Sequence, residues 1–237
     1  VIAITGSAGK TGTKEALKLA LQPSGAVHAS AKSFNNHWGV PLSLANMPKA
    51  VRFGVFEIGM NHAGEIAALT RLVRPHIAIV TTVAPVHLGF FRSVEEIADA
   101  KAEIFRGLEP KGSAIINRDS PYYERLKRHA LGHGAKIVGF GETQDAEARL
   151  MEVELRSDGS KIKADILGET IDYGLGAPGR HLVQNSLAVL AAVKMAGADV
   201  TLAARALDGL HAQAGRGART LIAAAGGRMA IIDESYN

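Results

Sequence analysis

The sequence contains no cysteine, has few aromatic residues and lacks any long apolar run. Without thiols the chain forms neither a disulfide framework nor a thiolate site for zinc or an iron–sulfur cluster. This composition fits the reducing cytoplasm, where we expect the protein to act. No stretch approaches the roughly 18 consecutive apolar residues of a membrane-spanning helix, so we expect no membrane span. No basic and apolar leader with a cleavage site is present, so we expect no secretory signal.

A strong charge of one sign is missing as well, because 27 lysines and arginines face 23 acidic residues and leave a net charge of +4. This small, scattered excess suits an anionic ligand but provides no basic surface for nucleic acid. What the chain does have is apolar content, which reaches 47% over 237 residues. That content supports a substantial buried core and excludes disorder as the main state.

Strand-length apolar segments alternate with segments of helical periodicity through the first part of the chain. Strands are expected at residues 1–5, 51–58, 77–83, 114–117 and 136–140, and helices at 11–21, 64–73, 93–108 and 122–130. This order predicts an α/β fold, in which a mostly parallel sheet is flanked by helices on both faces. Short segments at about 150–173 predict a small antiparallel side sheet, followed by helices at 182–196 and 202–210 and a hairpin at 220–233. No long linker separates these segments, so we expect a single domain.

A glycine-rich segment from Thr5 to Thr11 connects the first expected strand to the first helix. In that context backbone N–H groups and a helix N-terminus bind phosphate, a lysine reaches the outer phosphates, and a hydroxyl can bind Mg²⁺. The glycine spacing is shorter than in the general phosphate-loop pattern, and an ordinary glycine turn is the alternative. The candidate nucleotide-binding residues here are Gly6, Ser7, Ala8, Gly9, Lys10 and Thr11.

Two candidate metal ligands follow expected strands. Glu57 ends an apolar strand, and His87 lies just beyond another. Ligands of parallel sheets bind at the carboxyl ends of strands, where a carboxylate can hold Mg²⁺ beside the hydroxyl of Thr11. A solvated glutamate and a structural histidine are the alternatives.

Lys101 lies on the apolar stripe of its expected helix, four residues after Ile97 and three before Ile104. A lysine on a core-facing stripe is uncommon and unfavourable. It either pairs with a buried acid or reaches the surface, or its pKa falls through desolvation so that the neutral amine can react.

Polar residues cluster in two expected loops and on one expected helix. Asn35 and Asn36 lie in one loop, and Asn61 and His62 lie in the next. Loop asparagines usually form turns, but two such clusters after successive strands can also line a substrate cleft. Asn185 shares the opening turn of a helix with a histidine, which indicates either a base or ribose contact or simple capping.

Together these motifs resemble the Mur ligase family, the ATP-dependent amide-forming enzymes of peptidoglycan synthesis, in its central ATP-binding domain. The resemblance covers essentially the whole chain. The matching segments are residues 5–11, 35–41, 57–62, 85–88, 100–105, 179–181 with Asn185, 215–216 and 233–237. One departure is Gly12, where the family usually has a second threonine.

The resemblance implies a piece of a longer, three-domain protein. Residues 1–237 are then the central domain, and residues from about 230 begin the hinge to a C-terminal domain. An N-terminal domain would bind a UDP-sugar. The motifs indicate the family member whose substrates are UDP-MurNAc-tripeptide and D-Ala-D-Ala. ATP would phosphorylate the tripeptide carboxylate, and the dipeptide amine would attack the acyl phosphate.

Residue roles follow from the same resemblance. Lys10 would hold the outer phosphates of ATP, Thr11 and Glu57 the first Mg²⁺ ion, and His87 and Lys101, the latter as an N-carbamate, the second. Asn185 would face adenine, while Arg216 and either Asp233 or Glu234 would contact the nucleotide near the hinge. Asn35, Asn36, Asn61 and His62 are expected on the peptide-substrate side.

Two alternatives to this assignment remain open at the sequence level. Folylpolyglutamate synthetase shares the ATP domain and the carbamate lysine, although the asparagine motifs and the final Asp-Glu-Ser-Tyr-Asn argue against it. A nucleotide-binding switch or motor module without ligase chemistry is the other. The nearest match to the guanine-reading Asn-Lys-x-Asp of a switch GTPase starts at Asn117 and lacks the final aspartate, which weakens that reading.

Overall fold

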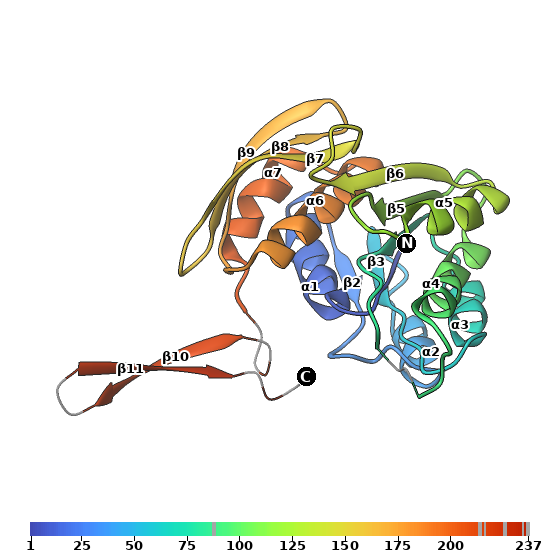
Figure 1. Cartoon of the computed structure of the whole chain (residues 1–237), viewed down its shortest axis with the longest axis horizontal. Helices are drawn as coiled ribbons and strands as arrows, with labels where there is room; N and C mark the ends of the chain where they lie inside the picture. The colour runs from blue at the N-terminus through green and yellow to red at the C-terminus, as the bar shows by residue number, and fades with distance from the viewer. Residues whose placement is uncertain (87–88, 213–214, 216, 225–226, 234, 236–237) are drawn as a thin grey trace.

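One long sheet organises the computed structural model, which describes residues 1–86, 89–212, 215, 217–224, 227–233 and 235 (Figure 1). Across the sheet its strands are β2 (Val27–Ala29), β3 (Phe53–Glu57), β1 (Ile2–Thr5), β4 (Ile77–Val80), β5 (Ser113–Asn117), β6 (Lys136–Gly141), β7 (Ala148–Leu155), β8 (Ser160–Ile166) and β9 (Glu169–Leu175). Pairing is parallel from β2 to β7 and antiparallel from β7 to β9. The expected mostly parallel sheet is therefore confirmed.

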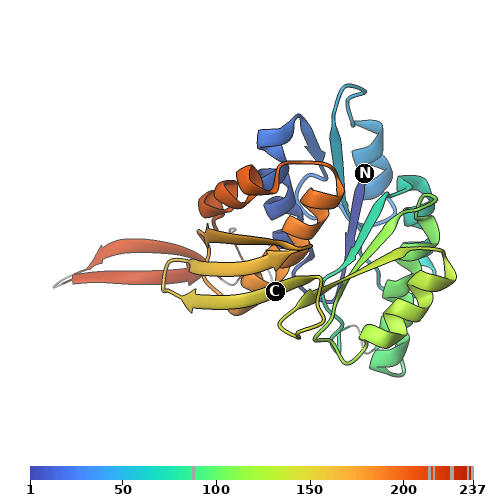
Figure 2. The ribbon, with the colours of Figure 1, turned by 90° about the horizontal axis from the view of Figure 1, so that it is seen from above.

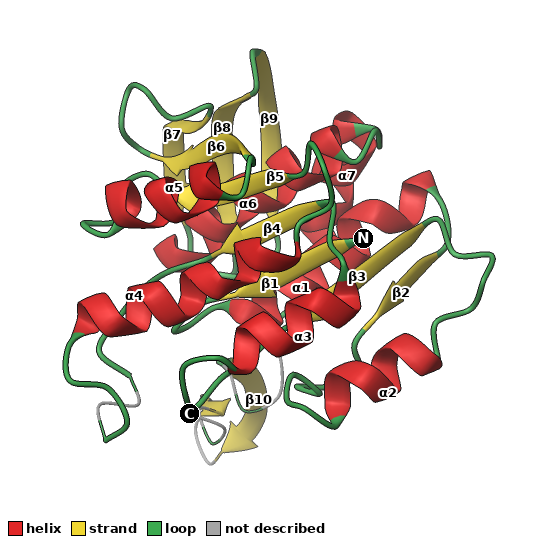
Figure 3. Ribbon diagram, turned by 90° about the vertical axis from the view of Figure 1, so that its right-hand side faces the viewer, coloured by secondary structure: helices red, strands yellow, loops and turns green. Residues whose placement is uncertain are grey.

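Helices cover both faces of the sheet. They are α1 (Lys10–Leu21), α2 (Gly39–Ala45), α3 (Glu65–Val73), α4 (Val94–Ala102), α5 (Tyr123–Gly132), α6 (Arg180–Met195) and α7 (Val200–Ala206), with short 3₁₀ turns at Gln22–Ser24, Glu103–Gly107 and Leu207–Gly209. Side chains alternate across a strand, so Ile2 and Ile4 of β1 pack with α1, α6 and α7, while Ala3 packs on the opposite side. Figure 3 shows α3 and α4 on that opposite side of the sheet.

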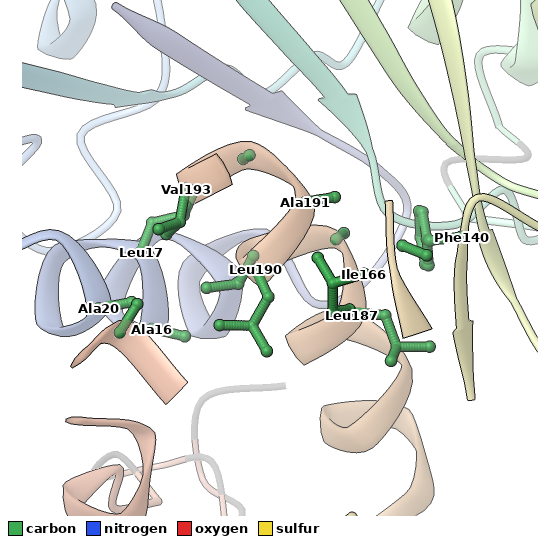
Figure 4. Close-up of a cluster of buried hydrophobic side chains, with 14 of the residues drawn as sticks. Ala16, Leu17, Ala20, Phe140, Ile166, Leu187, Leu190, Ala191 and Val193 are labelled. Atoms are coloured by element: carbon green, nitrogen blue, oxygen red, sulfur yellow. The ribbon is translucent and has the colours of Figure 1, made fainter. Parts of the chain in front are cut away.

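The larger core lies between the sheet and the helices α1, α6 and α7. Most of α6 is buried, because it lies between α1 on one side and strands β6 to β8 on the other. Figure 4 shows its side chains Leu187, Leu190 and Val193 among Leu17 of α1 and Ile166 of β8. This packing fixes α1, and with it the loop that precedes α1, against the sheet.

Several boundaries differ from the expectations. The antiparallel strands at residues 150–173 are present, but β7 pairs with β6 and so extends the main sheet. The expected helix at 93–108 is α-helical only to Ala102 and continues as a 3₁₀ turn. Strand β2 and helix α2 were not predicted.

The expected hairpin is present as β10 (Ala218–Ala224) and β11 (Gly227–Asp233), which pair antiparallel. Figure 2 shows this ribbon extending away from the body. Among the described residues no helix is both long and apolar enough to cross a membrane.

Candidate nucleotide-binding site

The carboxyl ends of three neighbouring strands bring the predicted site residues to one edge of the sheet. In β1, Ile4 pairs in parallel with Glu57 of β3 and with Ile79 of β4. The glycine-rich loop after β1, the carboxylate at the end of β3 and the chain after β4 therefore meet.

The chain after β4 holds the glycine-rich loop by hydrogen bonds. The Thr81 hydroxyl donates to the Ala8 carbonyl at 2.6 Å, and the backbone N–H of Ser7 donates to the Thr82 carbonyl at 2.8 Å. Gly6 has φ +152°, and a Cβ there would lie 1.9 Å from the Thr81 hydroxyl oxygen, so only glycine fits. This backbone therefore presents a fixed loop at the start of α1.

Helix α1 begins at Lys10, and its N-cap residue Gly9 makes no side-chain hydrogen bond to the first turn. Uncapped N–H groups at a helix N-terminus favour an anion. The ammonium of Lys10 donates to the Gly6 carbonyl at 2.8 Å, which keeps its charge at the loop. The predicted phosphate-loop residues thus share one concave backbone turn with a positive charge.

Lys101 is buried on α4, as its helical spacing predicted, with only 2% of its surface exposed. Burial, reinforced by the positive charge of Lys10, lowers its pKa to about 7. No ion pair within the described part of the chain includes Lys101. A large fraction of this amine is therefore neutral at physiological pH.

The carboxylate of Glu57 is 1% exposed at the end of β3. Its Oε1 accepts a hydrogen bond from Asn35 Nδ2 at 2.6 Å, whereas its buried Oε2 has no partner among the described residues. A buried carboxylate oxygen without a partner is costly. An Mg²⁺ ion, which prefers such hard oxygens, would satisfy it. Thr11, also buried, supplies the hydroxyl at the start of α1.

A cavity of about 440 Å³ lies beside this edge. Its lining includes Lys10, Asn35, Asn36 and Asn61, so it joins the phosphate loop to both predicted asparagine clusters. A larger hollow of about 850 Å³ over β8 and β9 contains none of the predicted site residues.

The asparagine clusters also have local structural roles. Asn36 Oδ1 accepts from the backbone N–H groups of Trp38 and Gly39 at 3.1 and 2.9 Å, so it caps the start of α2. Glu65 accepts from the backbone N–H of Asn61 at 2.8 Å and contacts His62 Nδ1 at 3.1 Å. The His62 side chain is 59% exposed.

The remaining predicted residues are more scattered. Asn185 on α6 contacts the phosphate loop, since its Nδ2 lies 2.7 Å from where a Cβ of Gly9 would be. Asp233 ends β11, and its carboxylate accepts from the backbone N–H groups of Gly215 and Ser235 at 2.7 and 3.1 Å. His87, Arg216 and Glu234 lie outside the described residues.

Sequence reasoning did not single out two further residues with structural contacts near the site. Thr81 anchors the loop, and nothing in its local sequence signals that role. Lys14 is fully buried on α1, and it lies three residues before the apolar Leu17 and seven before Leu21. Lys14 therefore lies on an apolar stripe of its helix, as Lys101 does, and its burial could have been predicted in the same way.

A phosphate loop, a buried carboxylate and a buried lysine at the carboxyl edge of a parallel sheet define a nucleotide-binding α/β domain. Residues 4–193 match the family model of the Mur ligase middle domain. The chain therefore belongs to the Mur ligase family, and the resemblance seen in the sequence is confirmed.

Individual relatives agree with this assignment. The chain is 37% identical over 220 residues to the UDP-N-acetylmuramoyl-tripeptide–D-alanyl-D-alanine ligase of Rickettsia prowazekii, covering 91% of this chain and 48% of that protein. It matches crystal structure I of MurF from Acinetobacter baumannii with a TM-score of 0.92 at 30% identity, covering 100% of this chain and 50% of the other. It matches MurF ligase from Thermotoga maritima in complex with ADP with a TM-score of 0.85 at 25% identity, covering 100% and 53%.

The chain spans about half the length of the relatives it matches. A folylpolyglutamate synthase from Mycobacterium tuberculosis matches at 19% identity with a TM-score of 0.73, covering 92% of this chain and 60% of the other, which shows a shared fold alone.

Proposed function

We propose that this chain is the ATP-binding part of a ligase that joins D-Ala-D-Ala to UDP-MurNAc-tripeptide. The observation that carries the proposal is the shared cavity, in which Lys10 of the phosphate loop lies beside Asn35, Asn36 and Asn61. A phosphoryl donor and a polar peptide acceptor can therefore meet in one hollow. The relatives named for this reaction support the choice of substrates.

In this proposal the nucleotide phosphates lie on the loop from Gly6 to Gly9 and at the N-terminus of α1. Lys10 balances the charge of the outer phosphates, and Asn185 lies where α6 approaches the loop. The hydroxyl of Thr11 and the Oε2 of Glu57, which has no partner among the described residues, would hold the first Mg²⁺ ion. Bound Mg²⁺ neutralises phosphate charge as the phosphoryl group transfers.

The chemistry proceeds in two displacements. A carboxylate oxygen of the tripeptide attacks the γ-phosphorus of ATP, the bond to the β-phosphate oxygen breaks, and ADP leaves. The amine nitrogen of D-Ala-D-Ala then attacks the acyl carbon, phosphate leaves, and the nitrogen loses a proton. Most of the acceleration comes from alignment and from balancing charge between two anions. We place Asn35, Asn36, Asn61 and His62 on the peptide side of this arrangement.

We further propose that Lys101 acts as an N-carbamate and, with His87, holds a second Mg²⁺ ion. The neutral amine adds CO₂, a nitrogen–carbon bond forms, and one proton leaves the nitrogen. The product replaces a cation with an anion that bears two hard oxygens, which suits Mg²⁺. The burial of Lys101 beside the charge of Lys10 favours the neutral amine that this addition needs.

The rest of the ligase belongs to other parts of the protein. We propose that an N-terminal domain binds the UDP-sugar and that a C-terminal domain follows the hinge near residue 230. Arg216 and either Asp233 or Glu234 would then contact the nucleotide as that domain closes. The reaction would take place in the cytoplasm. Residues 1–237 alone should fold but should not ligate at an appreciable rate, because under this proposal the N-terminal and C-terminal domains are needed to hold the peptide substrates in attack geometry.

Phosphate release by the complete protein tests the proposal. Release should require UDP-MurNAc-tripeptide and D-Ala-D-Ala together, and each substrate alone should give only background. A Lys10→Ala variant should lose this release, whereas Lys18→Ala, an exposed lysine of the same helix, should retain it. Release with a folate and glutamate would favour the folylpolyglutamate alternative. Release that ignores both peptide substrates would indicate a nucleotide switch.

A further inference from the structure

Lys14 is a fully buried lysine that the reaction above does not use. It lies on α1 one helical turn after Lys10, and its side chain is 0% exposed. Its Nζ donates to the carbonyl of Ser30 at 2.8 Å and to the carbonyl of Lys32, and it pairs with Glu15 Oε1 at 2.9 Å. Two hydrogen bonds to carbonyls and the ion pair with Glu15 therefore compensate the buried charge.

The two carbonyls belong to the loop between β2 and α2. Ser30 is anchored to the sheet, because its N–H donates to the Val55 carbonyl at 3.1 Å. Lys32 has φ +46°, a left-handed conformation that is unfavourable for lysine. The Lys14 ammonium compensates this conformation by capturing the carbonyl that it presents. Lys14 therefore fixes both the start and the turn of this loop.

The far end of the same loop forms one wall of the candidate site. Asn35 donates to Glu57 Oε1 at 2.6 Å, and its carbonyl accepts from the N–H of Gly59 at 2.8 Å. A Cβ on Gly59 would lie 2.8 Å from Asn35 Oδ1, so the loop packs closely on the strand end. The next residue, Asn36, caps α2 and lines the cavity.

We propose that Lys14 is a positioning residue that sets the segment from Ser30 to Asn36 against Glu57. The effect of Lys14 on catalysis rests on the proposed function, whereas its positioning of the loop does not. Helix α1 then carries two lysines one turn apart with different tasks. Lys10 faces the phosphate site, and Lys14 builds the peptide side of the cavity from the same helix.

Hydrogen exchange of the complete protein tests the positioning directly, with Lys14→Met as the variant. The amides of Phe34, Asn35 and Gly59 are hydrogen-bonded within or against this loop. Their exchange should become at least about tenfold faster in the variant. The amide of Ser7, bonded to Thr82, should be unchanged. The matched control is Lys18→Met, because Lys18 is an exposed lysine of the same helix.

Steady-state kinetics provide a second readout. KM for the two peptide substrates should rise roughly tenfold in Lys14→Met, because the cavity wall is displaced. Binding of ADP without Mg²⁺ should stay within about twofold, because the phosphate loop is intact and the proposed metal ligand Glu57 is not engaged. Lys14→Gln, which keeps a donor near the carbonyls, should give intermediate values. If Lys14→Met does not fold, hydrogen exchange and kinetics of Lys14→Gln test the positioning role instead.

Three outcomes separate the possibilities. Unchanged exchange at Phe34, Asn35 and Gly59 overturns the proposal, and so does an equal increase at Ser7, which would indicate general destabilisation. If exchange increases only at Phe34, Asn35 and Gly59, but the protein shows no peptide-dependent phosphate release, the positioning role is supported and only the proposed function is wrong.

Discussion

Two regions at the carboxyl edge of the sheet each bury a lysine, and they do so in opposite ways. On α1, Lys14 is surrounded by two backbone carbonyls and the carboxylate of Glu15. On α4, Lys101 is equally buried but has no ion pair among the described residues, and its pKa is lowered to about 7. Burial with partners compensates the charge of a lysine, whereas burial without an ionic partner lowers the pKa and favours the neutral amine.

The surroundings of Lys101 sharpen this contrast. Glu103 lies only two residues further on and is itself buried. Its carboxylate, however, accepts from the backbone N–H groups of Gly64 and Ala67 at 2.7 and 3.1 Å, at the start of α3. Both acids that lie two residues from Lys101 are therefore engaged elsewhere, since Glu103 holds another helix and Asp99 pairs with Arg125 and His129. The charge that does act on Lys101 is that of Lys10, which has the same sign.

The largest expected effect is that of Lys101→Met on the reaction. Phosphate release by the complete protein should fall by roughly a hundredfold to a thousandfold, the range seen when one charge-stabilising group is removed. The free energy of unfolding should be unchanged or higher, since a buried amine gives way to an apolar side chain of similar size. Activity assays and urea titrations check both parts, and a short exogenous carboxylate should restore some rate. A fully active variant would break the contrast between the two lysines.

Lys10→Ala should have the next largest effect, on nucleotide affinity. Loss of a charge-assisted contact to phosphate weakens binding by about 2 kcal/mol, or roughly thirtyfold. The pKa of Lys101 should also rise, because the neighbouring positive charge that lowers it is gone. Calorimetry with Mg²⁺–ATP measures the first change, and the pH dependence of the free energy of unfolding, with CO₂ removed, measures the second. Unaltered affinity would show that the glycine-rich loop is not the phosphate site.

Lys14→Met should lower the free energy of unfolding by about 2 kcal/mol, because it leaves the buried carbonyl of Ser30 and the part-buried carbonyl of Lys32 without their donor and Glu15 without its ion pair. Urea unfolding of this chain measures the change. This loss of stability contrasts with Lys101→Met, for which the free energy of unfolding should be unchanged or higher. Equal stability losses in the two variants would mean that Lys101 also has a stabilising partner.

The smallest effect concerns pH. The pKa of Lys101 is about 7 in the folded protein against 10.5 as the reference value for an unfolded chain. Between these values the unfolded state binds more protons, so stability due to this group rises with pH from about 7. The measurement compares the unmodified chain with Lys101→Met after CO₂ is removed. Between pH 8 and pH 9 the free energy of unfolding of the unmodified chain should rise by about 1 kcal/mol relative to that of the variant. If the difference in unfolding free energy between the two chains stays constant from pH 8 to pH 9, the pKa of Lys101 is not near 7.

The elements predicted well from the sequence are those with long, clear periodicity. Strands β1 and β3 to β6, with α1 and α6, follow directly from apolar patterning, and the candidate phosphate loop follows from its glycines, lysine and hydroxyl between a strand and a helix. Strand β2 has only three half-buried residues at the sheet edge, so its pattern is too short to detect. Helix α2 contains Pro41 and is capped by Asn36 from three positions earlier, which made the segment resemble a loop.

Sequence patterns located candidate site residues where residue type carries the chemistry, and they gave none where tertiary contact does. Lys10, Glu57 and Lys101 were identified from motif and stripe. The engagement of Asn35 with Glu57, and of Lys14 with the loop after β2, depends on strands that meet only in the folded chain. The partners lie 22 and 16 residues apart, so the contacts themselves leave no local signal, although the helical spacing of Lys14 does indicate its burial.

The most direct test of the contrast between the two lysines is carbon-13 NMR of the protein equilibrated with labelled bicarbonate and Mg²⁺–ADP. The account predicts one carbamate resonance that is present in the unmodified protein and in Lys14→Met and is absent in Lys101→Met. The same resonance should weaken below pH 7, as the amine of Lys101 becomes protonated. A spectrum without a carbamate signal, or a signal that persists in Lys101→Met, would contradict the account.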